Sequence, residues 1–313
     1  MTKRKLTLAQ EYLRDFCILL ALALSIFLFI KIKSWTAETQ TVKLTSSGEE
    51  RSYQIYVPKS YDPDTPAPLV ITLHGYTSNP ADAIYSSRWN TLADEEGLIA
   101  VYPLGYGSPT YWHISEYGYG GRSTQTEIQF LSDLIDRVEE NYNIDPARIY
   151  VNGISMGGGM SYVLACTLSE RIAAVGSVSG AYNYPLNKCK AAKPVPFIAF
   201  HGTEDTAVPY DGAVISEYNI TYPSVPVFIQ AYANQNQCSS TDEFPQEGEI
   251  SSTEYTHCAQ NADVILYTIH GGGHTWPGDT PAATPTWGYT TQQIDVTRLM
   301  WQFFEQHPLP VNN

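Results

Sequence analysis

The chain has 313 residues, of which 43% are hydrophobic and only 16% are charged. This composition excludes a disordered chain or a coiled coil, and the length suits one large α/β domain with additional segments. Six of the 18 basic and three of the 32 acidic residues lie within the first 40, so 12 and 29 remain in the rest. Because so acidic a body repels phosphate, we expect no nucleic-acid partner.

An unbroken apolar run, FCILLALALSIFLFI, covers residues 16–30 and has basic residues on both sides. Its length suits a signal peptide, whereas continuation to Trp35 gives a membrane span of 20 residues. Cleavage after Ala37 would put the bulky Trp35 where a small residue is needed. We therefore favour an uncleaved signal-anchor over residues 16–35, with a cleaved signal peptide second and a buried core helix third. The first two place the body at the cell surface or outside the cell.

The predicted organisation is an N-terminal segment at 1–35, a polar linker at 36–48 and one domain at 49–313. Within this domain, patterns of buried strands alternate with helical patterns, and Thr124 with Glu127 forms a capping box. Predicted strands cover 53–57, 69–73, 98–102, 148–151, 174–178, 197–200 and 264–269, and predicted helices cover 81–95, 124–138, 156–168 and 291–306. This alternation indicates a mostly parallel sheet with helices on both faces, whose substrates bind beyond the carboxyl ends of the strands.

Four cysteines lie outside the apolar run, and four cysteines allow three pairings. We choose the sequence neighbours, Cys166 with Cys189 and Cys238 with Cys258. In an oxidising compartment each bridge closes a loop of roughly 20 residues and contributes about 3 kcal/mol. The alternative is two pairs of buried free thiols. No CxxC or HExxH spacing occurs, so we expect no metal.

The pentapeptide Gly153-Ile154-Ser155-Met156-Gly157 lies between a predicted strand and a predicted helix. This is the context of a nucleophile elbow, in which a strained turn presents a serine at the end of the strand. The amide of Met156 then points toward a developing oxyanion at the helix N-terminus. The alternative is a glycine-rich turn that serves only packing.

A serine nucleophile needs a base and an acid that orients the base, and both follow later strands. Asp205 comes after the strand at 197–200, and Glu204 is the competing carboxylate. His274 comes after the strand at 264–269 within GGGHTWPG, and His270 is the rival base. The chain order Ser155, Asp205, His274 is the order of α/β-hydrolases, which we take as the fold class.

The second oxyanion donor should follow an early strand, and we nominate the amide of Tyr76 in LHGYTSN. His74 in the same loop is expected to brace it rather than to act directly. Two tryptophans, Trp112 and Trp276, are candidates to bind substrate by stacking on an aromatic acyl group or a sugar. The alternative for each is that it packs its own loop.

These motifs, together with IDPARIYVNGISMGGGMSYVLAC at 144–166 and PFIAFHGTEDTAVPY at 196–210, carry a resemblance from about residue 52 to residue 307. The sequence resembles secreted α/β-hydrolases of the polyhydroxybutyrate depolymerase and feruloyl/acetylxylan esterase type. The resemblance implies the same triad, the oxyanion donors Met156 and Tyr76, no cofactor, and the two cysteine pairings chosen above. Depolymerases of this group often carry Cys and Ala where this chain has Tyr76 and Met156, which argues against a polyester substrate.

The expected function is therefore exported serine esterase activity on hydroxyalkanoate-type esters or on feruloyl or acetyl polysaccharide esters, small or polymeric. One alternative is a serine peptidase of the same fold, although the chain has no spare block for a propeller or cap domain. The other is a surface-binding protein that has lost activity, although no triad member is missing. The sequence predicts no particular oligomeric state.

Overall fold

The structure is a computed structural model that describes residues 38–114, 123–215, 220–279 and 285–310. The chain divides into two units, residues 1–36 and 37–313, and the described residues belong to the second. The signal-anchor predicted at 16–35 lies outside them. None of the helices within the described ranges has the length and apolar character needed to cross a membrane.

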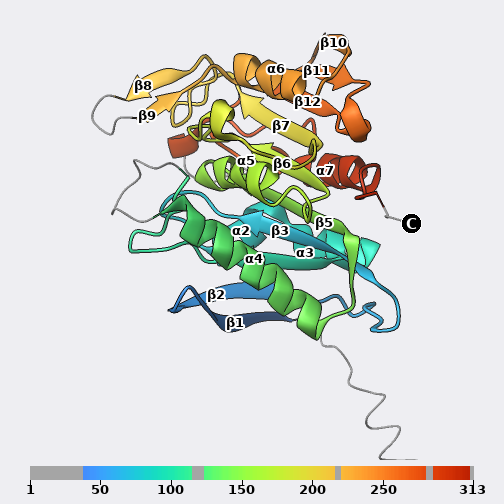
Figure 1. Ribbon diagram of the computed structural model, residues 1–313. Helices are drawn as coiled ribbons and strands as arrows, with labels where there is room; N and C mark the ends of the chain where they lie inside the picture. Colours follow the sequence, from blue (N-terminus) through green and yellow to red (C-terminus); the bar gives the residue numbers. More distant parts are fainter. Residues whose placement is uncertain (1–37, 115–122, 216–219, 280–284, 311–313) are drawn as a thin grey trace, which may run out of the picture. The chain divides into compact units, whose positions relative to one another are not determined.

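Ten strands form one sheet in the order β1-β2-β4-β3-β5-β6-β7-β12-β11-β10 (Figure 1). Its strands are β1 Thr39–Ser46, β2 Glu49–Tyr56, β3 Ala67–Leu73, β4 Ile99–Pro103, β5 Ile144–Ile154, β6 Ala174–Val178, β7 Phe197–Gly202, β10 Ser240–Glu247, β11 Ile250–Thr256 and β12 Val264–Ile269. From β4 to β12 all neighbouring strands are parallel, and the pairs toward both edges are antiparallel. The predicted mostly parallel sheet is confirmed. A separate hairpin pairs β8 Ala213–Ile215 with β9 Ile220–Tyr222.

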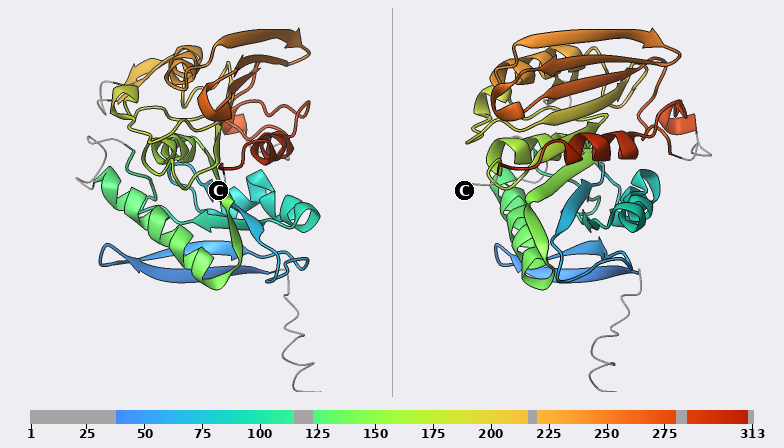
Figure 2. Two further views of the ribbon diagram at one scale, coloured as in Figure 1. Left: turned by 45° about the vertical axis from the view of Figure 1, so that its right-hand side comes forward. Right: turned by 90° about the vertical axis from the view of Figure 1, so that its right-hand side faces the viewer.

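Helices cover both faces of the sheet, as predicted for the α/β class (Figure 2). Helices α4, α5 and α6 lie on one face, and α2, α3 and α7 lie on the other. The helices are α2 Pro80–Ser87, α3 Trp89–Glu96, α4 Thr124–Asn141, α5 Met156–Thr167, α6 Val225–Gln235 and α7 Val296–Glu305. On the second face, Phe304 of α7 stacks between Trp89 of α3 and Tyr150 of β5, with ring centroids 6.1 and 4.8 Å away. This layer holds the central strands rigidly, so the loops at their ends have fixed positions.

The prediction of a linker at 36–48 is wrong, because residues 39–46 form strand β1 and pair with β2 along their whole length. The turn between the two strands is Ser47-Gly48, and both residues have a positive φ, 52° and 79°. A two-residue turn of this kind favours a hairpin because its twist matches that of the strands. The strand could not be recognised from hydrophobic alternation, because only Leu44 and Ser46 of β1 are buried.

Two of the predicted helical features also need correction. The helix predicted at 81–95 is two helices, because Arg88 adopts a left-handed conformation with φ 54° between α2 and α3. The predicted capping box does not form: Ser123 caps α4, and its hydroxyl accepts from the amide of Gln125 at 3.1 Å. Glu127 is instead fully buried, where it forms an ion pair with Arg51 of β2 at 2.9 Å.

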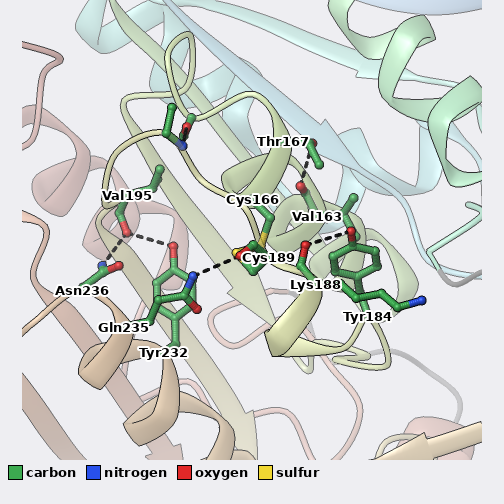
Figure 3. The surroundings of a disulfide bond; sticks show 12 residues. Val163, Cys166, Thr167, Tyr184, Lys188, Cys189, Val195, Tyr232, Gln235 and Asn236 are labelled. Atoms are coloured by element: carbon green, nitrogen blue, oxygen red, sulfur yellow. Dashed lines mark hydrogen bonds between the residues drawn. A yellow bond between two sulfur atoms is a disulfide. The ribbon is translucent and has the colours of Figure 1, made fainter.

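Both predicted disulfides are present, Cys166–Cys189 and Cys238–Cys258. Figure 3 shows the first, which joins the end of α5 to the segment before β7. That segment is also bonded to α6, because Gln235 donates to the carbonyl of Cys189 at 3.4 Å and Tyr232 donates to the carbonyl of Val195 at 3.0 Å. The bridge therefore connects α5, the helix that follows Ser155, to α6 on the same face of the sheet through the segment that precedes β7.

Candidate active site

Ser155 occupies the sharp turn between β5 and α5, with φ 58° and ψ −123°. A positive φ is strained for a residue with a side chain and is typical of nucleophile elbows. Neighbouring backbone holds the turn in place, since the amide of Ser155 donates to Val178 O at 2.9 Å and its carbonyl accepts from the amides of Gly159 and Ala181. The elbow therefore has the strand-turn-helix geometry that the sequence predicts.

Glycine is required at position 157, the second residue of α5, because the backbone of the helix lies close to the end of β3. A side chain added at Gly157 would place its Cβ 2.1 Å from the carbonyl oxygen of Leu73, the last residue of β3. Any larger residue would push the elbow away from the loop that follows β3. That loop lies directly beside the serine, because a Cβ built on Gly75 would be 3.4 Å from Ser155 Cβ and 3.9 Å from its Oγ.

Asp205 and His274 form a buried hydrogen-bonded pair. The imidazole Nδ1 lies 2.8 Å from Asp205 Oδ2, and the other carboxylate oxygen accepts from the amides of Ala207 and Val208 at 2.9 and 2.8 Å. Burial alone would raise the pKa of Asp205, but the hydrogen bond and charge of His274, together with His201 and the Val208 amide, hold it below its usual value. The carboxylate is therefore ionised and oriented toward the histidine.

The two residues considered as rivals point elsewhere. Glu204 is exposed, and its amide donates to Gly272 O at 2.9 Å, which ties the loop after β7 to the loop after β12. His270 is 2.8 Å from the hydroxyl of Ser251 on β11, through Nε2. The contact that a triad needs between acid and base is thus made by Asp205 and His274.

Ser155 lies at the same edge of the sheet as this pair. Strands β5, β6, β7 and β12 are consecutive parallel neighbours, so residues that directly follow β5, β7 and β12 share their carboxyl edge. Among the described residues no hydrogen bond joins Ser155 Oγ to His274. The structure therefore joins Asp205 to His274 and places Ser155 at the same edge of the sheet.

The loop after β3 is braced by His74, as expected. The ring Nδ1 donates to Gly75 O at 2.7 Å, and Nε2 accepts from the amide of Gly105 at 2.9 Å. Burial lowers the pKa of His74, so the ring is neutral with its proton on Nδ1. Because both nitrogens are engaged with backbone, His74 fixes the direction of the peptide that carries the Tyr76 amide.

The two tryptophans expected to stack on substrate are buried instead, Trp112 with 1% and Trp276 with 3% of its surface exposed. The indole of Trp112 donates to His74 O at 2.9 Å, and that of Trp276 donates to Thr297 of α7 at 3.0 Å. With no exposed ring face and satisfied N–H groups, both serve packing. The substrate-stacking expectation is wrong for these two residues.

Two further residues touch the pair and carried no assigned role in the sequence analysis. His201 Nε2 is 2.8 Å from Val208 O and 3.4 Å from Asp205 Oδ2, so a second imidazole faces the acid. Burial lowers the pKa of His201 and keeps it neutral, although Asp205 and Val208 act in the opposite direction. Trp287 is half exposed, and its ring centroid is 5.6 Å from that of His274. The sequence offered one indication that His201 lies near the site, because it stands at the end of a predicted strand, four residues before Asp205. It offered no such indication for Trp287.

Residues 45–278 match a protein family described as "Putative esterase". The matched segment covers more than half of the chain and contains Ser155, Asp205 and His274. The chain belongs to this esterase family.

Similarity to individual proteins of this kind extends over most of the chain. It is 30% identical to a bifunctional acetylxylan esterase/xylanase of Neocallimastix patriciarum over 73% of this chain and 31% of that protein. It is 29% identical to feruloyl esterase B of Piromyces equi over 83% of this chain and 46% of that protein. The esterase-family chain thus spans less than half the length of these two relatives.

A solved structure shows the same fold. An acetyl xylan esterase from Aspergillus awamori superposes with a TM-score of 0.57 and 17% identity, covering 75% of this chain and 94% of that one. The α/β-hydrolase fold predicted from the sequence is confirmed.

The stability of this esterase-family protein is expected to fall as the pH drops below about 6.5. Burial lowers the pKa of His74, His201 and His307, so below that pH the unfolded chain binds protons that the folded protein does not. Below about pH 6.5, each of these histidines lowers the free energy of unfolding by at most about 1.4 kcal/mol per pH unit. Above about pH 6.5 their full contribution to stability is present. Asp205, with its lowered pKa, acts in the same direction only at more acidic pH, below its usual value.

Denaturant unfolding at pH 7.5 and at pH 5.5 measures this dependence. His307→Gln is the matched variant, because glutamine can still donate to Phe303 O, which His307 Nδ1 contacts at 2.7 Å, and it does not titrate. Its unfolding free energy should change less between the two pH values than that of the wild type. A wild-type free energy that stays constant or rises on acidification would contradict the assignment of neutral buried histidines.

Proposed function

We propose that this chain is an exported serine esterase that cleaves carboxylic esters through an acyl-enzyme. The observation that carries the proposal is the buried pair of Asp205 and His274, joined at 2.8 Å, on the sheet edge that also carries the strained turn of Ser155. A neutral hydroxyl becomes a nucleophile when an oriented imidazole accepts its proton. Membership in the esterase family supports the same reaction.

In the proposed mechanism, His274 removes the proton of Ser155 as its Oγ attacks the ester carbonyl. Asp205 holds the proton on Nδ1 of the imidazole, which leaves Nε2 free to act as the base. The imidazolium then gives its proton to the oxygen of the leaving alcohol, and water repeats the two steps on the acyl-enzyme. The hydrogen bond between Ser155 and His274 is expected to form once substrate is bound, since catalytic hydrogen bonds are often long in empty sites.

The tetrahedral anion would be stabilised by two backbone amides, those of Met156 and Tyr76. Met156 is the first residue of α5, so its amide is not used by the hydrogen bonds of the helix. The loop of Tyr76 lies against Ser155 through Gly75, and His74 fixes its peptide. Donors fixed in advance at the position of the developing charge stabilise a transition state strongly.

The substrate class we infer is an ester of a polysaccharide that carries an acetyl or feruloyl group. Two relatives are named for acetylxylan and feruloyl esterase activity, which supports these acyl groups over hydroxyalkanoates. The formal net charge of −14 favours a neutral substrate over an anionic one. Exposed aromatic side chains on the loops around the site suit a sugar or an aromatic acyl group.

Export of the protein is proposed from two features. The disulfides Cys166–Cys189 and Cys238–Cys258 are stable in oxidising compartments. The apolar run at 16–30 is the expected export signal, and it would retain the protein at the membrane if it is not cleaved.

A fluorophosphonate probe tests the reaction class, and a panel of esters tests the acyl group. We expect the probe to label Ser155 in the folded protein, and we expect acetyl and feruloyl esters to be cleaved faster than butyryl and 3-hydroxybutyryl esters. A folded protein that is not labelled would favour a binding protein without activity. Cleavage of peptide bonds in preference to esters would favour a serine peptidase of the same fold.

A further inference from the structure

Aromatic side chains gather on the loops at the carboxyl edge of the sheet. Of the eight large hydrophobic side chains that are exposed within the described ranges, Tyr76, Tyr106, Trp287 and Tyr289 lie on the loops that follow β3, β4 and β12. Trp287 is the largest of these and has 50% of its surface exposed. Exposed hydrophobic side chains that lie singly are common, but several exposed rings on the loops of one edge are typical of a ligand-binding surface.

The position of Trp287 is fixed by backbone contacts with the loop that carries His274. The amide of His274 donates to Trp287 O at 2.6 Å, and the amide of Gly273 donates to Tyr289 O at 2.9 Å. A Cβ added at Gly273 would lie 2.2 Å from Trp287 O, so the two segments are in direct contact. These contacts hold the two segments beside each other, and the indole and imidazole ring centroids are 5.6 Å apart with planes inclined by 48°.

The side of the site on which Trp287 lies follows from the direction of proton transfer. In ester cleavage the histidine hands its proton to the oxygen of the leaving alcohol, so that alcohol must pass next to the imidazole. The acyl oxygen lies on the other side, at the amides of Met156 and Tyr76. A ring fixed beside His274 therefore borders the alcohol part of the ester rather than the carbonyl oxygen.

We propose that Trp287 is the binding platform for the leaving alcohol, a neutral sugar ring that stacks its apolar face on the indole. This inference rests on the proposed esterase function and adds a residue and a ligand class to it. Sugar rings carry C–H groups on one face, and a partly exposed indole suits them because both keep polar groups in water. An acidic protein does not repel such a ligand, whereas it would repel an anionic alcohol.

The test compares two esters with the same acyl group and different alcohols, methyl ferulate and a feruloylated arabinoxylan oligosaccharide. Trp287→Ala is expected to raise KM for the oligosaccharide ester at least about tenfold, with the kinetic constants for methyl ferulate changed less than about twofold. Trp287→Phe keeps a ring and should recover part of the loss. Phe244→Ala is the control, because it removes an aromatic side chain of equal exposure on the edge strand β10. It should leave the kinetic constants for both esters unchanged.

Three results would overturn the proposal. Equal losses on both esters would mean that Trp287 supports His274 or the acyl group, and unchanged KM for the oligosaccharide would mean that the ring does not bind the alcohol. In either case the wild type still cleaves methyl ferulate, so the esterase function stands. If the wild type cleaves neither ester and the fluorophosphonate probe fails to label it, the esterase function and this inference fail together.

Discussion

Ser155→Ala is expected to lower the rate of ester hydrolysis about 10⁶-fold, which corresponds to about 8 kcal/mol of transition-state stabilisation. The size of the loss follows from the role of the hydroxyl, because without Oγ no acyl-enzyme can form and His274 has no nucleophile to activate. The fold should be preserved, since the elbow is held by backbone hydrogen bonds of residue 155 that alanine also makes. The measurement is turnover of a nitrophenyl acetate ester, with unfolding free energy recorded alongside.

A second serine in a closely similar position provides the control. Ser179 directly follows β6, the strand next to β5, and also has a positive φ, 47°. Its hydroxyl is buried and has no hydrogen-bond partner among the described residues. Ser179→Ala should therefore keep full activity, whereas a folded Ser155→Ala protein that retained activity would exclude Ser155 as the nucleophile.

The central strands could be predicted from the sequence, whereas the edge strands could not. Strands β3 and β12 follow continuous or alternating apolar residues that the sheet buries, and β6 and β12 have the predicted bounds. Strand β10 has mostly exposed, polar side chains, so it shows no hydrophobic pattern. Its place is determined by pairing with β11, which is a long-range contact that a local pattern does not report.

Charged residues with distant partners were also beyond local sequence analysis. Glu127 occupies a capping-box position at the start of α4, but its partner Arg51 lies 76 residues earlier, on strand β2. Arg88 breaks the predicted helix where its guanidinium reaches Gly278 O and Asp295, both far along the chain. In each case a tertiary contact overrides the local preference.

The contact between Asp205 and His274 could be predicted because each residue follows a buried strand, and parallel strands bring their carboxyl ends together. The positions of the aromatic side chains around the site could not be predicted. Trp112 and Trp276 stand beside recognisable motifs in the sequence, yet both pack inside, whereas Trp287 reaches His274 because its segment returns to the loop at 273–275. The order of the strands thus predicts that Ser155, Asp205 and His274 share one edge of the sheet, while the paths of the loops decide which other side chains surround them.

Asp205→Asn is expected to lower kcat about 10⁴-fold without unfolding the protein. The asparagine carbonyl can still accept from the amides of Ala207 and Val208, which Asp205 Oδ1 now does, so the loop keeps its shape. Its amide group would face His274 Nδ1 and donate to it, which moves the imidazole proton to Nε2. A histidine in that tautomer cannot accept the proton of Ser155.

The matched control is Glu204→Gln, which makes the same change at the adjacent, exposed carboxylate and should leave kcat unchanged. Because the pKa of Asp205 is held below its usual value, the carboxylate is ionised throughout neutral pH. The loss in Asp205→Asn should therefore be the same size at pH 7 and at pH 8. If Glu204→Gln lost more activity than Asp205→Asn, or if the Asp205 variant kept more than a tenth of wild-type kcat, Asp205 would not be the acid that orients His274.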